Sequence, residues 1–130
     1  MPAMAMNHET DPRDQLLKKL GDISSVEVFN NQVLVAVYER PEKTKTGIVL
    51  PQAYRDEDKF QGKAALIVAM GPAAFQDADG RWFQGANLKT GDWILLRPSD
   101  GWPVTVNGTL CRMLNDTAVR ARIDRPDRVW

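Results

Sequence analysis

The strongest constraint on the fold is a series of short apolar runs, each closed by residues that favour turns. The runs at 33–38 and 64–69 have the length and β-branched content of buried strands. Asn107-Gly108 is a typical centre of a type I′ hairpin. Many short strands separated by turns predict an all-β fold, a small barrel or a sandwich. The alternation of Val26 and Val28 begins this β pattern, and further strands are expected at 93–96, 104–106, 109–114 and 119–123.

A short helix is predicted upstream, after a low-order leader at residues 1–10. Asp11 can cap its start, Pro12 suits its first position and Gly21 can end it. A helix of about nine residues is marginal alone, so its apolar face must dock on its own domain or on a neighbouring subunit. The residues of that face, and thus the predicted oligomer or partner contacts, are Leu16, Leu17 and Leu20.

Composition limits the class of protein. The 130 residues suit one domain, and 17 basic residues balance 17 acidic ones, so a nucleic-acid binder is not expected. The C-terminal arginines Arg120, Arg122, Arg125 and Arg128 alternate with acidic residues, which predicts a solvated tail. One cysteine permits no internal disulfide and suits a reducing compartment. Without a secretory signal or a long apolar run, we expect a cytoplasmic protein that does not bind membranes.

The residues of common catalytic sites are missing from the sequence. His8 is the only histidine and lies in the leader, which removes the usual triads and histidine-rich metal sites. No glycine-rich phosphate motif is present. Adjacent carboxylates at 56–58 are read as solubilising charge, and Cys111 as a small core residue. We therefore expect a binding or structural module, not an enzyme, with no cofactor and no metal.

A long polar loop at residues 39–61 carries an unusual apolar triplet, Ile48-Val49-Leu50. Ten charged residues, Pro41, Gly47 and Pro51 surround it. A loop of this length without secondary structure is usually functional or disordered. The triplet is either a short edge strand packed on its own domain or an anchor held out for a partner, and the residues alone leave both open.

The order of the motifs resembles that of the GroES-like co-chaperonins. Gly47-Ile48-Val49-Leu50-Pro51 looks like the anchor of their mobile loop. The strand opened by Gly62-Lys63 and ending in Gly71, and the segment 88–96 with Lys89-Thr90-Gly91-Asp92, look like the two landmarks that follow. The long leader and the single glycine before the anchor suit a divergent member, such as one encoded by a bacteriophage.

The resemblance implies a small GroES-like β-barrel at 31–124, with an N-terminal extension at 1–30 and a C-terminal tail at 125–130. It implies a mobile loop at 39–61 and a roof-like hairpin at 72–86, whose aromatic residues Phe75 and Trp82 are further predicted contacts. It also implies a heptameric ring that caps a GroEL-like chaperonin, which would bind and hydrolyse the ATP. The chaperonin-binding residues would then be Gly47, Ile48, Val49 and Leu50.

A loop anchor of this size favours a ring on energetic grounds. Burying three aliphatic side chains yields about 5–9 kcal/mol, and ordering the loop costs about 2–5 kcal/mol or more. The remainder is a weak, roughly millimolar site, which becomes useful only when linked copies bind together.

Two other functions remain open at the level of sequence. A virion structural protein, such as a capsid decoration or cement subunit, could use the same barrel, with the leader, helix and aromatic hairpin gripping a major capsid protein. A ligand-binding barrel is the third possibility, in which an exposed tryptophan would stack on a small ligand or oligosaccharide. The candidates for that stacking are Trp82, Trp93, Trp102 and Trp130.

Overall fold

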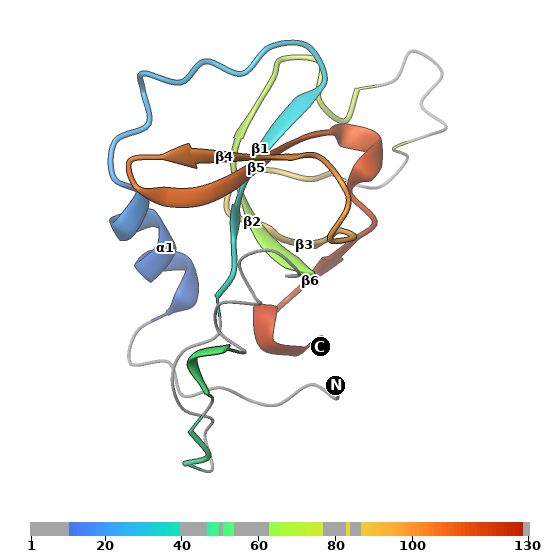
Figure 1. Ribbon diagram of the computed structural model, residues 1–130. Helices are drawn as coiled ribbons and strands as arrows, with labels where there is room; N and C mark the ends of the chain where they lie inside the picture. The colour runs from blue at the N-terminus through green and yellow to red at the C-terminus, as the bar shows by residue number, and fades with distance from the viewer. Residues whose placement is uncertain are drawn as a thin grey trace.

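The protein is built around one antiparallel sheet. The computed structural model describes residues 11–39, 47–49, 51–53, 63–76, 83 and 87–128. Six strands lie in the order β4-β5-β1-β2-β3-β6, and the sheet curls into a barrel-like shape (Figure 1). The strands are β1 (Gln32–Val37), β2 (Ala64–Met70), β3 (Trp93–Leu95), β4 (Trp102–Val106), β5 (Thr109–Asn115) and β6 (Ala121–Ile123).

The all-β prediction is confirmed, with one error upstream of β1. The predicted turn Asn107-Gly108 has φ values of 50° and 78°, as a type I′ hairpin requires, and joins β4 to β5. The expected strand around Val26 and Val28 is absent. Val26 donates its backbone N–H to the Ile23 carbonyl in a turn, and Val28 is buried without joining the sheet. Their alternation reflects side-chain packing on the sheet, not strand pairing.

The inner face of the sheet forms the main core. β1 contributes Val33 and Val35, which have no exposed surface, and their cross-strand neighbours face the same way. The remaining buried members are Ala65, Ile67, Ala74, Ile94, Leu96 and Leu114.

The outer face is also apolar and is covered by helix α1 (Pro12–Leu20). Leu34, Ala36 and Cys111 lie on this face and are fully buried. Leu20 of α1 is 1% exposed and joins their cluster, and Leu16 packs against its edge. The side of α1 that carries Leu16 and Leu20 therefore docks on its own sheet. Figure 1 shows the helix lying beside that sheet.

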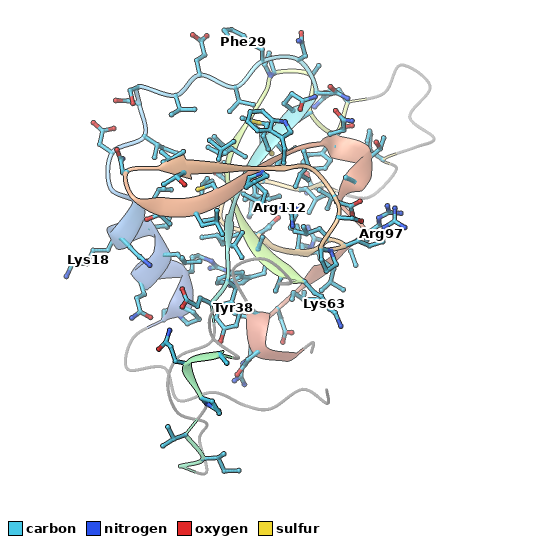
Figure 2. All side chains as sticks on the ribbon, viewed as in Figure 1. Lys18, Phe29, Tyr38, Lys63, Arg97 and Arg112 are labelled. Carbon is cyan, nitrogen blue, oxygen red and sulfur yellow. The ribbon has the colours of Figure 1, made fainter. Side chains whose placement is uncertain are left out.

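The predicted ends of α1 are confirmed. The Asp11 carboxylate accepts a hydrogen bond from the Arg13 backbone N–H at 2.8 Å. Gly21 has φ 70° and donates its N–H to the Leu17 carbonyl at 3.0 Å, and this left-handed conformation favours glycine. Lys18 points away from the sheet into solvent (Figure 2).

A buried carboxylate holds the turns around the end of β5. Asp116, 3% exposed, begins the short helix η1 (Asp116–Ala118). It accepts hydrogen bonds from the Phe75 backbone N–H at 3.0 Å and from the Asn31 amide at 3.3 Å. Nearby, a Cβ on Gly71 would overlap the backbone oxygens of Asn30 and Phe29, so only glycine fits there.

The strand predicted at 119–123 is present as β6, and Arg120 and Arg122 of the predicted solvated tail are about half exposed but paired with carboxylates. β6 pairs with β3, and a short helix η2 (Pro126–Arg128) follows. Arg120 lies 3.5 Å from Asp100 and Arg122 lies 3.6 Å from Asp92. Arg120 and Arg122 thus pair with carboxylates outside this segment, and Arg125 pairs with Asp127 within it at 3.1 Å.

The described residues form neither a membrane-spanning helix nor a cluster of metal ligands. None of the helices in the described part of the chain has the length and apolar character needed to cross a bilayer. No group of three or more His, Cys, Asp or Glu side chains among the described residues could hold a metal ion.

Candidate functional site

Loop 39–61 starts and ends at two firmly held stems. The Tyr38 N–H donates to the Ala64 carbonyl at 3.1 Å, and the Leu96 N–H donates to the Lys63 carbonyl at 3.0 Å. Tyr38 and Ala64 are 2% and 1% exposed. The Tyr38 ring meets the Trp93 ring edge-on, with centroids 5.7 Å apart. The loop therefore leaves the barrel at a fixed point, which Tyr38 marks in Figure 2.

The apolar triplet of this loop is presented to solvent as far as the structure describes it. Ile48 is 57% exposed and Val49 is 53% exposed. Gly47 just before them has φ 87°, a left-handed conformation that a side chain would strain. Leu50 lies outside the described residues, as do most of loop 39–61 and of the predicted hairpin 72–86. Among the described residues, Ile48 and Val49 are two adjacent aliphatic side chains outside the core clusters.

The predicted contacts on α1 have different environments. Leu20 is buried and Leu16 packs on the sheet, so their surface serves the protein's own core. Leu17 is 42% exposed and is not part of this packing. The sequence could not make this distinction, because all three leucines share one broad helical face.

The aromatic residues also differ from one another in how far their side chains are exposed. Phe75 is half-buried against the inner core and meets the Phe83 ring edge-on, with centroids 5.5 Å apart. Trp82 lies outside the described residues. Trp93 is 2% exposed in the stem of the loop, so it cannot stack on a ligand in this structure. Trp102 is 58% exposed, and Phe29, which the sequence did not single out, is 60% exposed and points outward (Figure 2).

A charged cluster lies where the β3–β4 connection meets β5. The Asp100 carboxylate lies 3.6 Å from Arg97 and 3.5 Å from Arg120, and accepts the Arg97 backbone N–H at 2.9 Å. Burial alone raises the pKa of Asp100, but this hydrogen bond and the charges of Arg120 and Arg97 outweigh it and hold the pKa below 3.8. Burial lowers the pKa of Arg112, and Asp100 offsets part of that effect. The cluster fastens the connection to the barrel.

The single thiol has no catalytic character. Cys111 is completely buried on the outer face beneath α1. Burial raises its pKa to about 11, with a smaller opposing effect from a Val106 backbone hydrogen bond. A protonated, inaccessible thiol is neither a nucleophile nor a metal ligand at neutral pH, which confirms its predicted role in the core.

Comparison with known proteins gives a consistent result. Residues 25–123 match the family model described as the chaperonin 10 Kd subunit. The co-chaperonin GroES of Halothermothrix orenii is 32% identical over 102 residues, which cover 78% of this chain and 99% of that protein. Co-chaperonin GroES of Listeria monocytogenes is 30% identical over 106 residues (82% and 97%), and that of Methylorubrum populi 35% over 80 residues (62% and 77%).

Proposed function

Because the chain belongs to the chaperonin 10 Kd subunit family, we propose that it is a co-chaperonin that docks on a chaperonin through loop 39–61. The observation that carries the mode of docking is the exposure of Ile48 and Val49 on a polar loop with rigid stems. We assign Gly47, Ile48, Val49 and Leu50 as the anchor. The apolar side chains would enter a hydrophobic groove of the chaperonin, and Gly47 would set the local backbone.

The assembly follows from the weakness of one anchor. Each loop offers only a few kcal/mol after its ordering cost, so a single subunit would dissociate readily. Linked copies raise the overall affinity by orders of magnitude without any new contact. We therefore propose a ring of subunits, heptameric as in the resemblance described above, that closes the chaperonin chamber from the cytoplasm.

The chemistry of the cycle would belong to the chaperonin. The core cysteine is buried and protonated, and the one carboxylate of the charged cluster, Asp100, is paired with arginines. In the proposed cycle the chaperonin binds and hydrolyses ATP. This protein supplies no catalytic group, and its contribution is the energy of binding and the shape of the lid.

Association with a chaperonin tests this proposal directly. The purified protein is mixed with a bacterial chaperonin, with and without ATP, and the complex is followed by size-exclusion chromatography with light scattering. We expect an oligomer that binds only with nucleotide. Ile48→Ser removes about 1.5–3 kcal/mol of burial per loop, and summed over a ring this abolishes association.

A matched control is available on α1. Leu17 is also an exposed aliphatic residue, but it lies outside the loop. Leu17→Ser is therefore expected to bind as the wild type does. A wild-type protein that stays monomeric, or that ignores the chaperonin with nucleotide present, contradicts the proposal.

A further inference from the structure

Helix α1 crosses the outer face of the sheet from the turn before β3 to the β4–β5 hairpin. At its first turn, the Arg13 side chain passes 4.0 Å from where a Cβ on Gly91 would stand, in the turn before β3. At its last turn, the Asn107 amide from the β4–β5 hairpin donates to the Leu20 carbonyl at 2.8 Å. The helix thus starts close to the turn before β3 and is hydrogen-bonded at its end to the β4–β5 hairpin.

Leu16, in the middle of α1, lies on the residues that hold the stems of loop 39–61. It packs against the buried cluster of Tyr38, Ala64, Leu66 and Trp93. Tyr38 and Ala64 are the hydrogen-bonded pair at which the loop leaves and returns. Leu16 also packs against the buried cluster on the outer face that contains Leu34 and Cys111. This leucine therefore connects the stem of the loop to the rest of the outer face.

We propose that Leu16 is a positioning residue for partner binding: α1 braces the stem of loop 39–61 and fixes the direction in which the loop carries Ile48 and Val49. This inference rests on the proposed function. It adds that the N-terminal extension acts on the affinity for the chaperonin without itself touching the chaperonin.

The brace acts through the population of binding-competent loops. When only a fraction of a protein holds the competent arrangement, its apparent dissociation constant rises by the inverse of that fraction. A loosened stem lets the loop leave the barrel in many directions, and the loss multiplies when several loops bind together. A modest loss of affinity at each loop therefore becomes a large loss of affinity for the whole ring.

Two variants separate bracing from ordinary stability. Leu16→Ala removes the contact with the Tyr38 cluster. Val106→Ala is the matched control, because Val106 is buried in the outer cluster around Leu34, apart from the stem cluster. Leu16→Val and Leu16→Met serve as graded and conservative replacements, so the series does not depend on Leu16→Ala folding well.

The first measurement is amide hydrogen exchange at Tyr38, whose N–H bonds the Ala64 carbonyl and reports opening of the stem. We expect exchange about tenfold faster in Leu16→Ala, an intermediate value in Leu16→Val, and rates within about twofold of the wild type in Leu16→Met and Val106→Ala. This measurement needs no chaperonin. Equal exchange at Tyr38 in Leu16→Ala and the wild type, or in Leu16→Ala and Val106→Ala, overturns the inference.

The second measurement is affinity for the chaperonin with nucleotide, at a temperature where all variants are folded. We expect Leu16→Ala to bind at least about fivefold more weakly, Leu16→Met to restore binding, and Val106→Ala to bind as the wild type does. Faster exchange with unchanged affinity overturns the positioning role. Absence of wild-type binding defeats the proposed function instead, and the exchange measurement still decides whether α1 braces the stem.

Discussion

The side-chain amide of Asn107 bridges two backbone carbonyls at the end of α1, donating to the carbonyl of Leu20, the last residue of the helix, at 2.8 Å and to that of Asp22, just after it, at 2.9 Å. The last carbonyls of a helix lack partners within the helix. Asn107 supplies one from the tip of the β4–β5 hairpin, where its own φ of 50° suits a type I′ turn. One residue therefore shapes the hairpin and fastens the helix.

Replacing Asn107 by glycine separates these two roles. Asn107→Gly keeps the positive φ accessible and removes both donated hydrogen bonds, so we expect a loss of about 1–2 kcal/mol in the free energy of unfolding. Urea denaturation followed by circular dichroism measures it. Asn107→Asp, which cannot donate, should lose a similar amount. A glycine variant as stable as the wild type would contradict the bridge.

Asp116 is expected to be the most sensitive carboxylate of the turns. Asp116→Ala leaves the Phe75 N–H and the Asn31 amide without their acceptor in a buried place, which should cost about 2–3 kcal/mol. Asp116→Asn keeps one acceptor oxygen and should cost less. Thr117→Ala, at an exposed position of the same short helix, is the matched control and should unfold at the wild-type urea concentration.

The lowered pKa of Asp100 predicts a dependence of stability on pH. Its ionised form is favoured in the folded state, so its contribution is present above 3.8, the ordinary pKa, and is lost as the pH falls through the lower folded value. Asp100→Asn should therefore be about 1–2 kcal/mol less stable than the wild type at pH 7. This gap should close as the pH falls through and below 3.8, measured by thermal unfolding. A gap independent of pH would contradict the assignment.

The reactivity of the Cys111 thiol reports how tightly helix α1 covers the outer face of the sheet. With its pKa raised to about 11 and no exposed surface, the thiol should resist iodoacetamide at pH 8 in the folded protein and react quickly in urea. Because it is the only cysteine, the rate needs no correction. Asn107→Gly should increase the rate, since a loosened α1 uncovers Cys111. Fast alkylation of the folded wild type would contradict the burial.

The sequence predicted the local elements well because local rules govern them. The strands at 33–38 and 64–69, the Asn107-Gly108 turn and the caps of α1 all lie where pattern and turn chemistry place them. The strand predicted around Val26 and Val28 was wrong. Alternating apolar residues show that one side of a segment packs on the protein, and such packing does not require pairing with a neighbouring strand.

Other features depend on contacts between distant parts of the chain. Three leucines on one helix show that a face is buried, yet nothing local distinguishes a neighbouring subunit from the protein's own sheet. The pairing of Asp100 with Arg120 joins residues twenty positions apart, so the sequence alone suggested only a solvated tail of arginines interleaved with acids. The proposed anchor stood out in the sequence as an apolar triplet in a polar loop, and the structure adds the exposure of Ile48 and Val49 and the construction of the stem.

The bulge in β2 bears on how such chains can diverge. The register with β1 skips Val68, so Val68 and Ala69 both pack on the outer side while Met70 returns to the inner core. Deleting Val68 would restore the regular alternation of side chains and leave the inner core in place. It would remove an apolar side chain from the outer face that α1 covers. The bulge and the helix should therefore occur together in related proteins. In a relative without α1, we expect the residue at the position of Val68 to be absent or polar.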